Sequence, residues 1–196
     1  MALIRNLNNY SPQKGERYFV DTNVWYWFTY VSSKDMKVVD VPRHYQMTDY
    51  SAFIEKALNN GSQLYHCALS LAELSSIIEN SELKLYISTK NITPISKKFY
   101  RTIPIERKGV VNEIDIAWKT ICSLSTCADI TLTEQTASTT QSILAKTTLD
   151  PYDSFYVQLM DIHNITNIIT DDGDFSSIDG RAIYTANRKL VNGLYK

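Results

Sequence analysis

Short apolar runs alternate along the chain with longer segments whose apolar residues recur at helical spacing. The short runs have the length and composition of buried strands and cover 17–20, 63–69, 166–170 and 182–185. The periodic segments run from Thr48 to Asn60 and onward from Ser70. Strands that alternate with helices predict an α/β fold with a mainly parallel sheet and right-handed crossovers.

Start and stop signals predict the remaining helices. The aromatic-rich stretch from Asn23 to about Tyr30 suits a buried helix. Asp150-Pro151 marks the start of another, which we expect to run to about Ile162, because proline fits the first helical position. Two further helices are expected in the less regular middle of the chain, at about 109–124 and about 133–146.

Composition narrows the class of protein without identifying it. A chain of 196 residues is long enough for one substantial domain, and we expect residues 17–196 to form it behind a loosely ordered lead-in at 1–16.

With a net charge of -1, a nucleic-acid binder would need a local basic patch. Candidate phosphate contacts lie in a basic cluster that could equally be a solvated surface: Lys97, Lys98, Arg101, Arg107 and Lys108.

The cysteines and the apolar runs bear on where the protein works. Cys67, Cys122 and Cys127 show no metal-binding spacing and leave one cysteine unpaired, which suits a reducing compartment. No apolar stretch is long enough for a signal peptide or a transmembrane helix. We therefore expect a cytoplasmic protein that makes no contact with a membrane.

Acidic residues recur where predicted strands end and the next helices begin. They are Asp21 after the first strand, Glu73 and Asp153 in the first turns of two helices, and Asp171, Asp172 and Asp174 after the strand at 166–170. In an open parallel sheet, strand carboxyl ends and helix amino ends share one edge, and ligands bind there. We therefore expect these acids to converge on one cleft.

Gathered carboxylates need a compensating charge. Two carboxylates about 5 Å apart repel by about 3 kcal/mol at an effective dielectric of about 20, so a cluster must share protons or bind a cation. Oxygen ligands without a convergent His or Cys set favour Mg²⁺ or Mn²⁺. One or two such ions could activate a water for in-line attack on a phosphodiester.

Each acid taken alone also has a structural explanation. Ser70-x-x-Glu73 matches a capping box, and Asp153 would favour the helix dipole. The segment from Asp171 to Asp174 could be a turn, and Asp21 could cap the next helix. The joint pattern is more specific than any single member.

Three motifs together resemble the successive motifs of the PIN domain, and in particular the toxin-like ribonucleases of the VapC type. They are FVDTNVW at 19–25, SLAELSSIIE at 70–79 and DPYDSFYVQLMDIHNITNIITDDGDF at 150–175. The resemblance implies a three-layer α/β/α sandwich with a mainly parallel central sheet. It also implies an endoribonuclease that uses Mg²⁺ or Mn²⁺ and a metal-activated water to leave 5′-phosphate and 3′-hydroxyl ends.

The resemblance assigns roles to residues of this chain. It implies that the catalytic and metal-binding acids are Asp21, Glu73, Asp153, Asp172 and Asp174. Asp171 falls at a position that is often basic in the family. Supporting roles fall to Thr22, Asn23 and Thr170.

The chain is longer than compact members of that family. Extra, partly helical segments at about 28–62 and about 88–148 could carry substrate specificity or a partner surface. RNA is the expected partner, with an antitoxin protein and a second copy of the chain as further candidates. Two alternatives stay open: a catalytically silent scaffold that binds RNA or protein, and a metal-dependent nuclease that acts on DNA.

Overall fold

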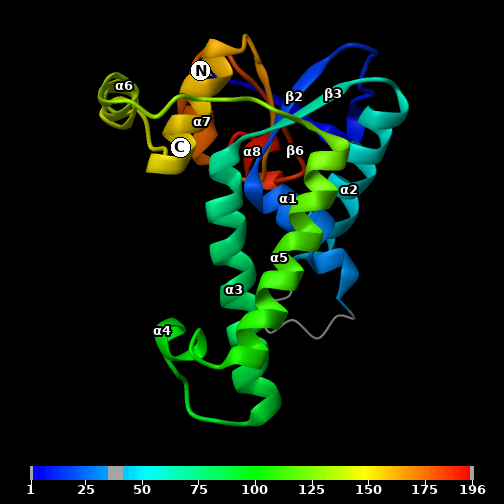
Figure 1. The fold of residues 1–196 in the computed structure, drawn as a ribbon. Helices are drawn as coiled ribbons and strands as arrows, with labels where there is room; N and C mark the ends of the chain where they lie inside the picture. Colours follow the sequence, from blue (N-terminus) through cyan, green and yellow to red (C-terminus); the bar gives the residue numbers. More distant parts are fainter. Residues whose placement is uncertain (1, 35–41, 195–196) are drawn as a thin grey trace.

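The computed structural model describes residues 2–34 and 42–194, and its centre is a parallel sheet (Figure 1). Six strands pair in the order β1-β6-β5-β2-β3-β4, and every pair is parallel. The strands are β1 (Leu3–Asn6), β2 (Arg17–Val20), β3 (Gln63–His66), β4 (Thr126–Cys127), β5 (Asn167–Ile169) and β6 (Ala182–Thr185).

Helices cover both faces of this sheet. They are α1 (Thr22–Thr29), α2 (His44–Asn59), α3 (Ala68–Lys90), α4 (Lys97–Tyr100), α5 (Pro104–Leu124), α6 (Glu134–Leu144), α7 (Pro151–Ile162) and α8 (Arg188–Val191). Short 3-10 turns are η1 (Leu7–Asn9), η2 (Val31–Ser33) and η3 (Asp174–Ser177). The predicted α/β/α sandwich is therefore confirmed.

The central strand β2 shows why two layers of helices are needed. Successive side chains of a strand point to opposite faces of the sheet. Tyr18 and Val20 lie in one buried cluster, which α1, α2, α3 and α5 share. Phe19 lies in the other, which contains Leu159 and Met160 of α7. The strand is thus buried on both sides, as its continuous apolar run predicts.

Several element boundaries differ from the sequence expectation, and one of them is the start of α2, which lies at His44 rather than Thr48. Strand β3 ends at His66, because Cys67 caps α3 by accepting a hydrogen bond from the Leu69 N–H. Helix α5 begins at Pro104, earlier than expected, with proline in the first turn. The lead-in expected at 1–16 contains β1, which pairs with β6 at the edge of the sheet.

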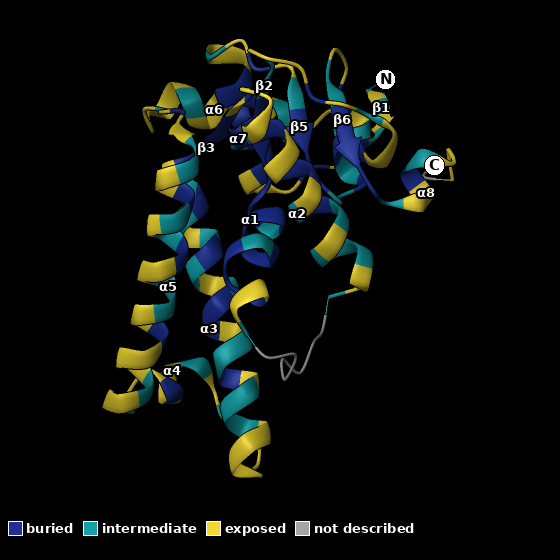
Figure 2. Ribbon diagram, turned by 90° about the vertical axis from the view of Figure 1, so that its right-hand side faces the viewer, coloured by how far each residue is buried: buried dark blue, intermediate teal, exposed yellow. Residues whose placement is uncertain are grey.

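Helices α3 and α5 extend side by side away from the sheet, with α4 near their far end (Figure 1). A small separate cluster of Leu83, Tyr100 and Val110 holds these three helices together. Much of the outer surface of α5 is exposed (Figure 2). Helices α4 and α5 of the extra segment at 88–148 therefore build an arm together with α3, whereas α6 of the same segment packs against α7.

Cys67, Cys122 and Cys127 are all free, and Cys67 is buried. Among the residues that the structure describes, none of the helices combines the length and the apolar character needed to cross a bilayer.

Leu74 of α3 is fully buried in the cluster beneath α1 and α2. We predict that Leu74→Ala lowers the free energy of unfolding by about 2–5 kcal/mol, because it removes buried methyl groups and leaves a cavity. Urea denaturation measures this. Leu132→Ala is the control, since Leu132 is 59% exposed, and should change stability by less than about 0.5 kcal/mol. Equal losses in the two variants would contradict the assigned core.

Candidate active site

Asp21 lies where β2 ends and α1 begins. Its side chain is buried, with 3% of the residue exposed. One carboxylate oxygen, Oδ1, accepts a hydrogen bond from the Asn23 N–H at 3.3 Å, so Asp21 does cap α1. The other, Oδ2, accepts from the Thr170 hydroxyl at 2.6 Å. Both oxygens are held by donors, and the carboxylate therefore has a fixed orientation.

Thr170 connects Asp21 to the acidic turn after β5. It follows a strand that pairs directly with β2, with Val20 opposite Ile169. While its hydroxyl donates to Asp21, the same oxygen accepts from the Asp172 N–H at 2.9 Å. Asp172 Oδ1 in turn accepts from the Asp174 N–H at 2.8 Å. This chain of hydrogen bonds fixes Asp172 relative to Asp21.

Glu73 lies beyond the first turn of α3, because the helix begins at Ala68. Its Oε2 accepts a hydrogen bond from the Tyr156 hydroxyl at 2.8 Å, and Thr22 Oγ1 lies 3.3 Å from the same hydroxyl. The capping box at this helix joins Cys67 and Ser70. The structural explanation of Glu73 as a capping residue is therefore wrong.

Tyr156 is a site residue that the sequence does not single out. It is fully buried in α7, three residues after Asp153 on the same face of the helix. Burial raises its pKa, so the phenol stays protonated and remains a donor. Its neighbours in the sequence are apolar, so Tyr156 looks like an ordinary core residue. Only its spacing from Asp153 could have indicated that its hydroxyl faces the site.

Asp153 lies in the first turn of α7, where its N–H donates to Asp150 Oδ1 at 2.9 Å. Asp150 thus caps the helix, and it also adds negative charge near Glu73, Asp153 and Asp172. The sequence identifies Asp150 only as a cap, whereas the structure places it beside the acidic cluster.

Burial and neighbouring negative charges raise the pKa values of four acids at this edge of the sheet. Burial, followed by the charge of Glu73, raises the pKa of Asp21 to about 7. Burial, then the charges of Asp21, Asp150, Asp172 and Glu73, raises that of Asp153 to about 9. Burial likewise raises the pKa values of Glu73 and Asp172. The charges of Glu73 and Asp172 thus act on Asp21, and those of Asp21, Glu73 and Asp172 act on Asp153.

The cluster suits a hard cation by its chemistry. Within residues 2–34 and 42–194, no three His, Cys, Asp or Glu side chains stand close enough together to enclose a metal ion. The Glu73 carboxylate accepts a hydrogen bond from Tyr156 instead, and the Asp172 carboxylate accepts one from the Asp174 N–H. The donors are nevertheless all carboxylate oxygens, which Mg²⁺ and Mn²⁺ prefer. A divalent cation would also offset the raised pKa values, because it opposes the charges that cause them.

The neighbouring Asp171 is held outside the cluster. Its carboxylate accepts hydrogen bonds from Tyr50, Gln46 and Tyr45 at 2.8, 2.8 and 3.1 Å, all from α2. Helix α2 belongs to the extra segment at 28–62, so this segment braces the acidic turn. Asp174 begins η3, and its charge contributes to the raised pKa of Asp172.

The candidate phosphate contacts divide into two groups. Arg101 and Arg107 line a groove between α3 and α5, and Lys97 donates to Ser76 on its rim. The remaining two candidates, Lys98 and Lys108, are exposed and do not line that groove.

Comparison with known proteins identifies the family. The model of the PIN domain matches residues 18–181, which include every acid of the cluster. No curated protein matches the chain. PIN domains are generally nucleases that use divalent metal ions and bind nucleic acid. Because the match covers most of the sequence and the fold agrees with it, the chain belongs to the PIN domain family.

Proposed function

We propose that this protein is an endoribonuclease that depends on Mg²⁺ or Mn²⁺ and hydrolyses RNA phosphodiester bonds. The observation that carries the proposal is the placement of Asp21, Glu73, Asp153 and Asp172 at one edge of a parallel sheet, where Asp21 and Asp153 are buried and Thr170 links Asp21 to Asp172. Negative charges of the same group raise the pKa values of Asp21 and Asp153. Such a cluster is costly to maintain unless it binds a cation. Membership of the PIN family supports the broader nuclease activity.

The side chains around the acids prepare them for that task. A divalent cation bound there would polarise the scissile phosphate and lower the pKa of a water molecule. Thr170 and the Asn23 N–H fix the carboxylate of Asp21, and Tyr156 holds that of Glu73. Prior orientation of this kind reduces the reorganisation needed when substrate binds. We expect products with 5′-phosphate and 3′-hydroxyl ends. The Asp174 N–H orients the Asp172 carboxylate, and the Asp174 carboxylate is proposed as a further metal ligand.

A toxin role, an antitoxin partner and a homodimer are narrower predictions. We expect the cleavage to take place in the cytoplasm. A small DNA-binding protein encoded beside this chain, and its binding to the purified nuclease, would support the toxin role.

We predict that Asp172→Asn lowers kcat/KM for RNA cleavage by about a hundredfold or more, because it removes a charged oxygen ligand from the cluster. Asp115→Asn makes the same change at a control position, since Asp115 lies on the exposed surface of α5 and pairs with Lys119. It should keep cleavage within about threefold of the unchanged protein, provided that circular dichroism shows it folded. The assay follows labelled RNA with added Mn²⁺.

The same assay separates the rival functions. Equal cleavage by the Asp172→Asn variant would assign the activity to a contaminant. Cleavage of single-stranded DNA in preference to RNA would replace the proposed substrate. RNA binding without cleavage at millimolar Mg²⁺ or Mn²⁺ would identify a silent scaffold.

We predict that the metal-free protein loses stability as pH rises from about 6 to about 8. The folded-state pKa values of Asp21 and Asp153, about 7 and about 9, lie above the ordinary value of 3.8. The folded state therefore holds more protons than the unfolded state in this range, and deprotonation favours unfolding. Asp21→Asn removes one of these groups, so its Tm should fall less over the same range.

Thermal melts in a chelator measure this effect, and Asp115→Asn on exposed α5 should behave like the unchanged protein. Added Mn²⁺ at about pH 8 should raise the Tm of the unchanged protein more than that of Asp21→Asn, because a ligand of the folded state stabilises it. A Tm that rises with pH in the chelator would contradict the assigned burial of these acids.

A further inference from the structure

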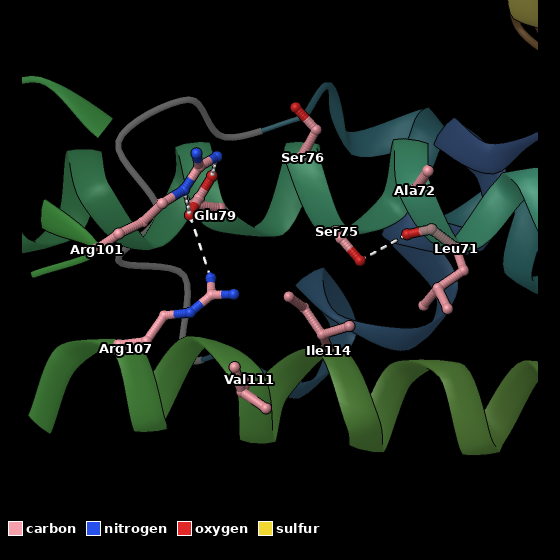
Figure 3. A pocket seen from close by; sticks show the side chains of 9 residues that line it. All are labelled: Leu71, Ala72, Ser75, Ser76, Glu79, Arg101, Arg107, Val111 and Ile114. Carbon is pink, nitrogen blue, oxygen red and sulfur yellow. Dashed lines mark hydrogen bonds and ion pairs between the residues drawn. The ribbon is translucent and has the colours of Figure 1, made fainter. Parts of the chain in front are cut away.

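A groove with a volume of about 470 Å³ runs between α3 and α5 (Figure 3). Its inner walls are small and aliphatic, with Leu71 and Ala72 on α3 and Val111 and Ile114 on α5. Charged side chains gather at one end (Figure 3). Along α3 the groove begins at the level of Glu73, because Leu71 and Ala72 lie within one helical turn of it.

Glu79 is the buried centre of the charged end, with 4% of the residue exposed. Arg101 binds it in bidentate fashion, Nε to Oε1 at 2.6 Å and Nη2 to Oε2 at 2.5 Å. The hydrogen bond from Arg101 holds the pKa of Glu79 below its usual range, so the carboxylate stays ionised. One arginine is therefore sufficient to neutralise this acid.

Arg107 is a second guanidinium beside an acid that is already paired. Its Nη1 reaches Glu79 Oε1 at 3.4 Å, a long contact with an oxygen that Arg101 already occupies. Within the described part of the chain, Glu79 is the only acid that Arg107 pairs with. The Arg107 side chain is 47% exposed, so much of its guanidinium faces solvent.

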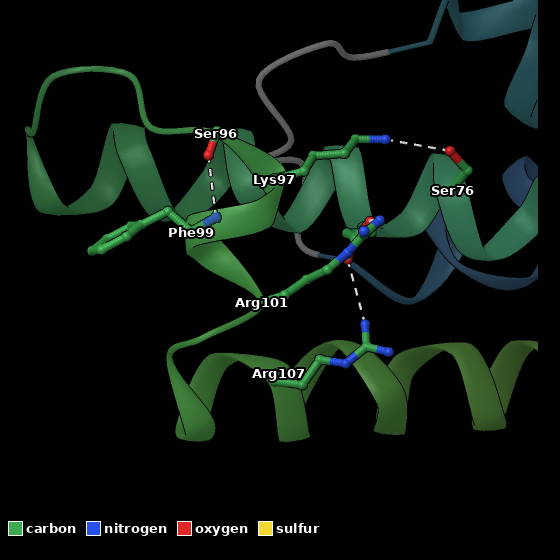
Figure 4. Close-up of polar contacts among 7 residues, drawn as sticks. Ser76, Ser96, Lys97, Phe99, Arg101 and Arg107 are labelled. Atoms are coloured by element: carbon green, nitrogen blue, oxygen red, sulfur yellow. Dashed lines mark hydrogen bonds and ion pairs between the residues drawn. The ribbon is translucent and has the colours of Figure 1, made fainter.

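Lys97 adds a third positive charge at the rim. Its Nζ donates to Ser76 Oγ at 3.3 Å (Figure 4). Glu79 is the acid among the residues that line the groove, and it already pairs with both Arg101 and Arg107. Positive charge therefore exceeds negative charge at this end of the groove.

The surplus charge lies at a fixed distance from the acidic cluster. Ser76 follows Glu73 by three residues, so the two are neighbours on the surface of α3. Glu79 lies about 9 Å from Glu73 along the same helix. A single nucleic-acid strand whose scissile phosphate lies at the cluster would carry further phosphates along this direction.

We propose that the charged end of the groove binds a backbone phosphate of single-stranded RNA, with Arg107 and Arg101 as its ligands and Lys97 at the rim. The identity of the polymer rests on the proposed function. A guanidinium presents paired donors that match phosphate oxygens, and an exposed one beside a saturated carboxylate has donors to spare. Glu79 is a positioning residue, because it fixes the plane of Arg101.

The test measures binding of a fluorescently labelled single-stranded RNA by anisotropy, with Asp172→Asn in every protein to suppress cleavage. We expect Arg107→Gln to weaken binding about five- to tenfold at about 0.1 M salt and to reduce the salt slope of the affinity by about 0.7. Lys108→Gln makes the same charge change one residue away on α5, outside the groove lining, and should stay within about twofold.

A second pair of variants tests the groove itself. Val111 lines it and is 47% exposed, so Val111→Glu should fold and place a negative charge in the groove. We expect this variant to weaken RNA binding by a factor similar to that of Arg107→Gln. Asn112→Glu adds the same charge beside it, outside the lining, and should have little effect. Thermal melts confirm that each variant is folded.

Equal affinities for Arg107→Gln and Lys108→Gln would overturn the proposal, because the effect would then be one of net charge. A polyglutamate peptide that displaces the RNA at equal charge concentration would also overturn it, in favour of an acidic protein partner. Failure of the two proposals can be distinguished. Arg107-dependent binding without cleavage by the unchanged protein would refute the nuclease function alone, whereas cleavage with Arg107-independent binding would refute the groove alone.

Discussion

Burial of several carboxylates of like charge at one sheet edge is the constraint on which this structure depends. The hydrogen bond from Thr170 to Asp21 stabilises one of these buried carboxylates, and it joins the ends of the two central strands. The bond exists only in the observed register, in which Val20 lies opposite Ile169. A slip of one of these strands by one residue would turn its side chains to the other face of the sheet and separate the pair. Strand pairing and site assembly are therefore one requirement.

Adjacent acids in the turn after β5 meet this constraint in opposite ways. Asp171 accepts three side-chain hydrogen bonds from α2 and serves the fold. Asp172 has the Asp174 N–H as its donor and adds its charge to the field on Asp21 and Asp153. The extra segment that contains α2 thus supplies the donors that hold the Asp171 carboxylate.

Much of this arrangement follows from the sequence by a single rule. Parallel strands bring their carboxyl ends to one edge, so Asp21 and Asp172 could be expected to meet without knowledge of any contact. Details set by tertiary contacts could not be predicted in that way. The hydrogen bond from Tyr156 to Glu73 joins residues 83 positions apart, and it has no local signature. Helix α3 begins at Ala68 rather than at Ser70 because Cys67 caps it, and cysteine is not among the residues that usually indicate a helix cap.

The ion pairs of Glu79 could not be predicted from the sequence either, because Arg101 and Arg107 follow it by 22 and 28 residues. A basic cluster on its own indicates only surface charge. The structure separates its members, because Arg101 binds the buried Glu79 through two nitrogens while Arg107 makes one longer contact with it. Glu73 and Glu79 lie on one long helix. The helix therefore fixes the distance between the acidic cluster and the arginines that bind Glu79. A strand bound at both points would be oriented by the rigid helix before any chemistry begins.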